Sequence, residues 1–170
     1  MRSLLFSLGV VTLAACSGRG SAEGRLQAEW QGARSGTFSD VATATHCAES
    51  GIVFLEAIRA DSGVAMALHP ADPAVIAPGT FPAMSGSTPN PPKPVVFVGL
   101  RSFEATEVRG WEAHGGTVTI DTAGGVLSGR FDLRMQLVDG TDTLTMTGTL
   151  TAVRVVRDTA GCLTRLRRNY

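Results

Sequence analysis

The sequence predicts an all-β domain, an antiparallel β-sandwich or flattened barrel of about nine strands. Apolar and polar residues alternate with a period of two along most of the chain from Arg25 onward, which is the pattern of strands with one buried face. Glycine-rich breaks separate these runs, and no apolar stripe at helical spacing extends over ten residues. All eight prolines lie within residues 69–94. A sandwich is preferred, because this proline segment interrupts the long, evenly inclined strands that a barrel needs.

Four strands are expected before the proline segment, over residues 25–32, 35–47, 51–60 and 64–69. In the first, the alternation places Leu26, Ala28 and Trp30 on the inward face. The third run, "GIVFLEAIRA", is nearly continuous in apolar residues. Such a run is typical of a strand that is covered on both faces or packed at an edge.

Five strands are expected after it, over residues 93–103, 104–114, 116–121, 126–138 and 143–152. A turn at Gly115-Gly116, directly after His114, separates the second of these from the third. The glycines of "TAGG" predict the next turn, at residues 122–125. The apolar face changes parity after Ala152, so a β-bulge is expected near that residue.

The last two strands are expected to form a hairpin, and the length of its loop determines which residues lie opposite each other. A four-residue loop over Asp139–Asp142 sets Leu137 opposite Leu144 and Phe131 opposite Leu150. A two-residue loop at Asp139-Gly140 keeps the same faces inward but sets Leu137 opposite Asp142. The four-residue loop is preferred, because it pairs every inward apolar residue with an apolar residue or glycine.

The proline segment cannot form central sheet, because proline donates no hydrogen bond to a ladder. Its "VIAPGTF", residues 75–81, predicts a short edge strand, and its "SGSTPNPPKP", residues 85–94, predicts an exposed loop. The loop is interpreted as a cover over the fold. The alternative is a rim that lines a binding mouth or docks a partner.

The N-terminus predicts export. Arg2 precedes the apolar run "LLFSLGVVTL", residues 4–13, which is too short to span a bilayer and fits a signal peptide. The following "LAAC", ending at Cys16, resembles the lipobox of bacterial lipoproteins at every position. That resemblance implies removal of residues 1–15, a diacylglyceryl thioether on Cys16 and often acylation of the new amine. With Ser17 next, it also implies the outer membrane.

The chain after the signal divides into a tether and one domain. Residues 16–24 hold the lipidated cysteine and the small, polar "SGRGSAEG", which is typical of a flexible linker. Residues 25–170 are the size of a single all-β domain. The series "PGTF", "GGTVTI", "LSGRFDL" and "MTGTL" resembles the strand pattern of uncharacterised exported β-sandwich lipoproteins. That resemblance carries no catalytic residues.

The charge balance argues against nucleic acid as a partner. The chain has 15 lysines and arginines against 15 aspartates and glutamates, so no basic excess is available to neutralise phosphates. The C-terminal arginines are interpreted as a solvated tail, and the alternative is a patch for anionic headgroups or a polymer. They are Arg154, Arg157, Arg165, Arg167 and Arg168.

Two cysteines remain once Cys16 is modified. In an exported chain, Cys47 and Cys162 are expected to form one structural disulfide that fastens the C-terminal segment to an early strand. A redox or metal pair is the alternative, but the chain has no Cys-x-x-Cys motif. His46, which adjoins Cys47, points to the opposite face of a strand.

No motif carries catalysis, a metal or a cofactor. His46, His69 and His114 have no metal-ligand spacing. Glu104, Glu107 and Glu112 are interpreted as solvated partners of neighbouring arginines, and the Asp-Gly of "DGTD" as turn chemistry. We therefore expect no catalytic residue, metal or cofactor.

The leading hypothesis is a lipid-anchored envelope protein that binds a partner, such as another envelope protein, without catalysis. One alternative is a carrier of a small apolar ligand inside the fold, in a cavity between the sheets. The least favoured alternative is a hydrolase with a histidine–carboxylate pair in a cleft. Residues that would line the carrier's cavity are Phe131, Leu133, Met135, Leu144 and Met146.

Overall fold

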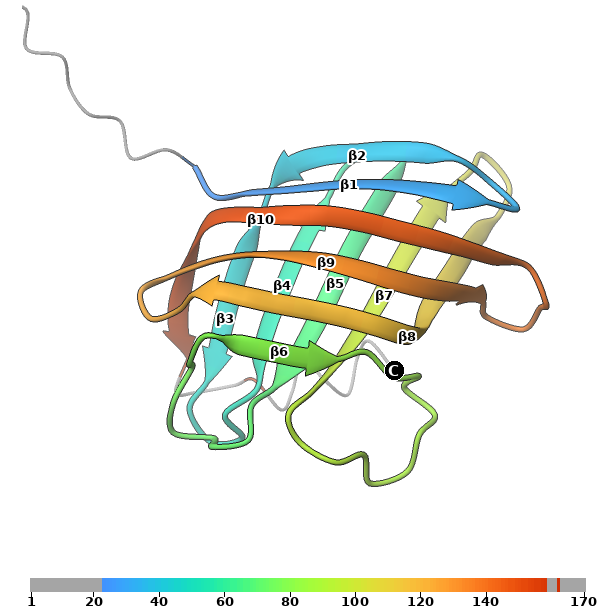
Figure 1. Ribbon diagram of the computed structural model, residues 1–170. Coiled ribbons are helices and arrows are strands. Elements are labelled where there is room, and N and C mark those ends of the chain that lie inside the picture. The colour runs from blue at the N-terminus through green and yellow to red at the C-terminus, as the bar shows by residue number, and fades with distance from the viewer. Residues whose placement is uncertain (1–22, 159–161, 163–170) are drawn as a thin grey trace, which may run out of the picture.

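The computed structural model describes residues 23–158 and Cys162, and over these residues the chain is all-β, as predicted (Figure 1). Ten strands form one sheet, and every pairing between named strands is antiparallel except that of β3 with β10. The strands are β1 (Arg25–Gly32), β2 (Gly36–Val41), β3 (Thr43–Cys47), β4 (Val53–Ile58), β5 (Ser62–His69), β6 (Gly79–Pro82), β7 (Val95–Phe103), β8 (Val108–Thr122), β9 (Val126–Leu137) and β10 (Thr143–Asp158).

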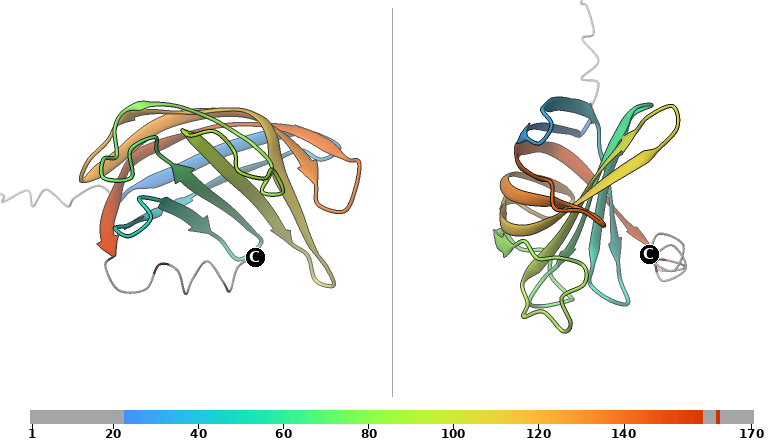
Figure 2. Two further views of the ribbon diagram at one scale, coloured as in Figure 1. Left: turned by 90° about the horizontal axis from the view of Figure 1, so that it is seen from below. Right: turned by 90° about the vertical axis from the view of Figure 1, so that its right-hand side faces the viewer.

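The sheet folds over itself into two layers that face each other (Figure 2). A front layer holds β2, β1, β10, β9, β8 and β6, and a rear layer holds β3, β4, β5 and β7 at a steep inclination to it (Figure 1). The pairing runs from β3 through β4, β5, β7, β8 and β9 to β10, which returns to β3. The predicted sandwich therefore has a ring-like closure at its corners.

Two long strands make these corners by passing from one layer to the other, as in orthogonally packed sheets. The first half of β10 lies between β1 and β9, and its last residues, Val155–Asp158, pair with β3. The change follows a bulge at Ala152, which adopts a positive φ of 48°. The bulge expected near residue 152 is thus confirmed.

The second corner lies in β8, where a turn at Gly115-Gly116 was predicted. That prediction is wrong. Residues 108–122 form the single strand β8, which pairs with β7 at its start and with β9 and β6 farther along. The glycines mark a register shift, not a turn, and Gly116 adopts a φ of 99°. A side chain on Gly116 would overlap the backbone of Asp132 on β9. Glycine is needed here for close approach between strands.

The expected strand over residues 35–47 is also divided between the layers. It breaks at Ala42 into β2, which pairs with β1, and β3, which pairs with β4 and β10. Ala42 itself is buried and donates its backbone N–H to the carbonyl oxygen of Gly24 at 2.9 Å. The described contacts of the domain thus begin at Gly24, one residue before the predicted start.

The preferred register of the last hairpin is wrong by two residues. Leu144 pairs with Met135 and Gly148 with Phe131, which is the register of the two-residue loop. Leu137 is opposite Asp142, whose carbonyl oxygen accepts its N–H at 2.8 Å. Leu137 is nevertheless packed against the core, because its neighbour on the other side is Trp111 of β8.

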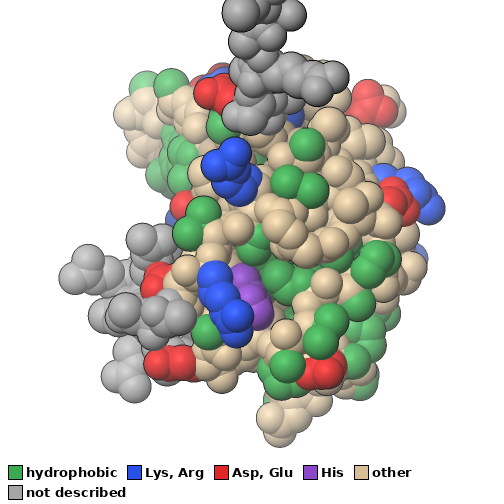
Figure 3. Space-filling model, turned by 90° about the vertical axis from the view of Figure 1, so that its left-hand side faces the viewer, with side chains coloured by type: hydrophobic (Ala, Val, Ile, Leu, Met, Phe, Trp, Pro, Cys, Tyr) green, Lys and Arg blue, Asp and Glu red, His purple; other side chains and the backbone are tan. Residues whose placement is uncertain are grey.

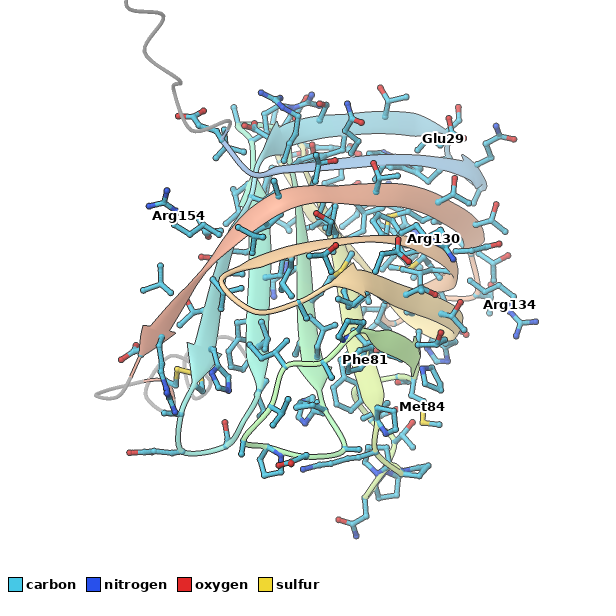
Figure 4. All side chains as sticks on the ribbon, turned by 60° about the vertical axis from the view of Figure 1, so that its left-hand side comes forward. Glu29, Phe81, Met84, Arg130, Arg134 and Arg154 are labelled. Carbon is cyan, nitrogen blue, oxygen red and sulfur yellow. A yellow bond between two sulfur atoms is a disulfide. The ribbon has the colours of Figure 1, made fainter. Side chains whose placement is uncertain are left out.

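The space between the layers is a continuous apolar core. Every strand contributes apolar inward residues to this core, and β3 contributes Ala44. Each fully buried aliphatic or aromatic side chain stabilises the fold by about 1.5–3 kcal/mol. Charged side chains face away from it, as Glu29, Arg134 and Arg154 do in Figure 4. The largest fully buried side chains are those of Phe38, Leu26, Leu55, Met66, Leu100, Ile120, Leu127, Leu133, Met135 and Met146.

The proline segment behaves as expected at one edge of the sheet. Its β6 pairs with β8 alone and stands at the end of the strand order, and Phe81 turns inward to a buried position. Residues 85–94 form a loop. Proline is tolerated in β6 because an edge strand leaves one row of backbone groups unpaired.

The predicted disulfide is present. Cys47 at the end of β3 is bonded to Cys162, with Cα atoms 5.6 Å apart across a sequence separation of 115 residues. It ties the chain beyond the last strand to an early strand, as expected. Among residues 23–158 and 162, no helix has the length and apolar character needed to cross a membrane.

Candidate functional site

An apolar hollow of about 530 Å³ lies on the outer face of the rear layer. On β4, the side chains of Val53, Leu55 and Ala57 enter the core, so the alternate residues of that strand face away from it. The same alternation holds on β5, β7 and the start of β8. We call this hollow the outer trough. The residues that shape it are Phe54, Glu56 and Ile58 on β4, Gly63, Ala65 and Ala67 on β5, Phe97, Gly99 and Arg101 on β7, and Gly110 and Glu112 on β8.

The trough is hollow because β5 carries only small residues on this face between Gly63 and Ala67. Ala67 of β5 lies between Phe54 of β4 and Phe97 of β7 in one row of paired residues. In the next row Ala65 lies between Glu56 and Gly99. Large side chains on both flanking strands thus enclose a floor of alanine and glycine.

The third row of paired residues completes the trough. Ile58, Gly63, Arg101 and Gly110 follow one another across β4, β5, β7 and β8. Ile58 is 64% exposed, so this edge of the trough presents an apolar side chain directly to solvent. Exposed apolar surface in a concave site is typical of a place where another group binds.

The charges at the trough are mainly negative. Glu56 and Glu112 belong to the same row of paired residues, separated by Ala65 and Gly99. Arg101 contributes one positive charge in the neighbouring row. An occupant with apolar side chains and positive charge would match this arrangement.

His69 closes one end of the outer face of β5. Its ring meets the ring of Phe97 edge to face, with centroids 5.1 Å apart. Burial lowers the pKa of His69 below its ordinary value of 6.5, and the positive charge of Lys93 lowers it further. Both effects favour the neutral imidazole over the charged one.

Glu112 also anchors the loop that follows β6. Its Oε1 accepts a hydrogen bond from Ser85 Oγ at 2.9 Å, and its Oε2 accepts one from the Gly86 backbone N–H at 3.3 Å. His114 Nε2 lies 3.2 Å from Oε1. These contacts clamp the loop of residues 83–94 against β8, so the loop borders the trough.

The contact of His114 with the Glu112 carboxylate is a histidine–carboxylate pair of the kind that the hydrolase hypothesis requires. The hydroxyl group beside this pair is that of Ser85. It is bonded to the carboxylate of Glu112 and to Ser87 Oγ, and not to His114. Ser85 is only 7% exposed. A nucleophilic serine needs an adjacent base and access to substrate, and this arrangement gives Ser85 the geometry of a structural anchor.

Of the three glutamates expected to pair with arginines, Glu104 and Glu107 do so. The expectation is wrong for Glu112, whose carboxylate is bonded to Ser85, Gly86 and His114 instead. Glu104 is bonded to Arg34 of the β1–β2 turn, and Glu107 to Arg109. Arg109 also lies 4.0 Å from Glu104. These pairs are partly exposed, so each contributes little to the free energy of unfolding, but together they link the ends of the two layers.

The residues expected to line an internal cavity are buried in the packed core, and none of them borders the outer trough. A second hollow inside the fold has a volume of about 10 Å³, no larger than one water molecule. The five residues are Phe131, Leu133, Met135, Leu144 and Met146.

The remaining predicted positions are not brought together. His46 is buried on β3, away from His114 on β8, and the part of the chain that the structure describes holds no cluster of three metal-binding side chains. Cationic and anionic side chains are interspersed on the described part of the face in Figure 3. Cys16, Arg165, Arg167 and Arg168 lie outside the described residues.

The trough is not evident from the sequence, although the sequence holds two signals for it. The nearly continuous apolar run "GIVFLEAIRA" is typical of a strand that is covered on both faces or packed at an edge, and "SGVAMALH" alternates large residues with alanine and glycine. Neither signal shows that the two strands are neighbours, or that β7 flanks β5 on the other side. Comparison with known proteins adds no further guide, since no family model, curated protein or solved structure matches the chain.

Proposed function

We propose that this protein is a lipid-anchored protein of the bacterial cell envelope that binds a partner without catalysis. Its partner would be a peptide segment with apolar and cationic side chains, and its binding surface would be the outer trough. The single observation that carries the proposal is this trough, whose alanine and glycine floor is enclosed by Phe54, Phe97 and Ile58 outside the packed core.

The shape of the trough favours a chain-like ligand. Its floor follows β5 and is open at Ile58, which is 64% exposed. Aromatic walls supply large apolar contact area at low cost in side-chain entropy. Glu56 and Glu112 favour a cationic ligand over an anionic one, since opposite charges steer association and exclude competing partners.

The anchor proposal rests on "LAAC" and the short segment that follows it. Cys16 would carry the lipid, and seven residues separate it from Gly24, where the described contacts begin. Two or three acyl chains hold a protein stably at a membrane, whereas one holds it only marginally. The domain would then act within a short distance of the membrane surface, in the outer membrane if Ser17 directs sorting as the resemblance implies.

A binding measurement tests the proposal. The mature chain with Cys16→Ser, residues 16–170, retains every described strand and the disulfide. We expect it to bind a fluorescently labelled peptide of leucine and arginine, measured by anisotropy at low salt, and to bind a leucine–glutamate peptide at least tenfold more weakly. Ala65→Trp fills the trough and should weaken binding of the cationic peptide at least tenfold.

Thr147→Trp is the matched control, because Thr147 is exposed on β10 of the front layer. It adds the same indole on the opposite side of the molecule and should leave the affinity unchanged. Equal loss in both variants, or no binding of either peptide, would contradict the proposal. Binding of a labelled fatty acid in place of the peptides would support the small-ligand carrier instead.

A further inference from the structure

We infer that the C-terminal segment of this chain, residues 163–170, is itself a ligand of the outer trough. Its sequence is "LTRLRRNY". In the folded protein it would lie across β4, β5 and β7, with apolar side chains on the alanine and glycine floor and arginines toward the acidic edge. The placement stands on the disulfide and the trough alone. Its effect on partner binding rests on the function proposed above.

The disulfide delivers this segment to the trough. Cys162 is bonded to Cys47 of β3 and borders the hollow. Cys162 therefore lies where the outer face of the rear layer begins. Eight residues continue from that point to the end of the given sequence.

The length of the segment suits the distance. Neighbouring strands are about 4.8 Å apart, so β5 lies about 10 Å from β3 and β8 lies about 19 Å from it. Eight residues span about 12 Å as a helix and up to about 26 Å when extended. The segment reaches the floor of the trough in either conformation.

The chemistry of the segment is complementary to that of the trough. Leu163, Leu166 and Tyr170 recur at intervals of three and four residues, a spacing that sets apolar side chains on one side of a chain with helical geometry. Three arginines alternate with them. The trough offers apolar walls and the carboxylates of Glu56 and Glu112, with Arg101 as the opposing charge.

Tethering would make the segment a strong competitor. A ligand joined to its site by a short linker acts at an effective concentration in the millimolar range. A partner with similar chemistry must displace it, so binding of the partner would be weakened in proportion to that effective concentration. Removing the segment should therefore raise the affinity for the cationic probe peptide at least tenfold.

The experiment compares the mature chain with Cys16→Ser and the same chain ending at Cys162. The methyl groups of Ala65 and Ala67, which lie on the floor, are observed by NMR. We expect both methyl signals to shift when the segment is removed and to return when a synthetic peptide of residues 163–170 is added. The methyl signal of Ala28, which faces the core, should not move.

A second pair of variants keeps the chain length constant. The triple variant Arg165→Glu, Arg167→Glu and Arg168→Glu should shift the Ala65 and Ala67 signals toward those of the shortened chain. The matched control, Arg154→Glu with Arg157→Glu, alters two arginines of β10 outside the segment and should leave these signals in place.

Unchanged Ala65 and Ala67 signals in the shortened chain would overturn the inference. So would shifts that depend on protein concentration, because a second copy of the chain would then cover the trough. The two proposals fail separately. If the shortened chain shows the expected shifts but binds no probe peptide, the proposed function fails. If both chains bind the probe with equal affinity, the tethered segment is not a ligand.

Discussion

The ring of Phe131 on β9 lies against the Cα of Gly148, the residue directly opposite it on β10. A methyl group on Gly148 would overlap that ring and also the backbone oxygen of Gln27 on β1. The glycine therefore lets three strands approach one another where the front layer meets the core. This pairing fixes the register of the hairpin, because no other residue of β10 between Leu144 and Leu150 leaves this space on the inward face.

We expect Gly148→Ala to lower the free energy of unfolding by about 3 kcal/mol, because the added carbon must displace an aromatic ring or separate two strands. Urea denaturation followed by tryptophan fluorescence measures this change. Gly79→Ala on β6 is the control, since nothing lies within 4 Å of its added carbon. A similar loss in both variants would mean that the contact with Phe131 is not the cause.

The hairpin register can be tested with engineered disulfides on its exposed face. Arg134 pairs with Thr145 in the structure, whereas the four-residue loop would pair it with Thr147. We expect Arg134→Cys with Thr145→Cys to form a disulfide, because directly opposite strand residues have the required spacing. Arg134→Cys with Thr147→Cys should keep two free thiols. Thiol titration after air oxidation distinguishes the pairs, and the reverse outcome would restore the four-residue loop.

Removing the Cys47–Cys162 disulfide should lower the free energy of unfolding by about 2–5 kcal/mol, because it closes a long loop in the unfolded chain. The double variant Cys47→Ser and Cys162→Ser, in the Cys16→Ser background, is compared with its parent by urea denaturation. Adding a reductant should destabilise the parent by the same amount and leave the double variant unchanged. Equal stability of the two oxidised chains would contradict this expectation.

The lowered pKa of His69 predicts that the folded protein loses stability in mild acid. Its pKa is lowered in the folded state, so as the pH falls through about 6.5 the unfolded chain takes up a proton before the folded chain does. The contribution is therefore complete above pH 6.5 and is lost as the pH falls toward the lowered pKa. We expect the free energy of unfolding to decline between pH 7 and pH 5.

His69→Gln should make that decline shallower, measured by urea denaturation at each pH. Parallel curves for the variant and the parent would rule out His69 as the source. The contribution of Asp61, whose pKa is lowered chiefly by the hydrogen bond from Arg59, is present above its ordinary value of 3.8 and is lost only below it. It therefore falls outside the measured range.

Ser85→Ala tests whether the cluster around Glu112 is structural or catalytic. It removes one hydrogen bond to a carboxylate that also accepts from Gly86 and contacts His114. We expect the free energy of unfolding to fall by about 1–3 kcal/mol, with no hydrolysis of a generic ester panel before or after the change. Hydrolysis by the parent that Ser85→Ala abolishes would favour the hydrolase alternative.

The alternation in the sequence was sufficient to predict which side is buried in the strands where it is regular. The period-two pattern is local, so Leu26 and Ala28 on β1 and the alternating apolar residues of β9 and β10 are inward as predicted. The sequence also identified the disulfide, since two cysteines remain in a chain predicted to be exported, and the edge position of the proline segment, since proline cannot donate to a ladder.

How these strands meet depends on contacts between distant parts of the chain. Leu137 opposite Asp142 looked unfavourable within the hairpin, but its apolar partner is Trp111 on the other neighbouring strand. The outer trough arises because β7 pairs with β5, although a proline-rich segment of about 25 residues separates them. Register and adjacency are set by the packing of residues far apart in the chain, and a pattern of period two carries no information about that packing.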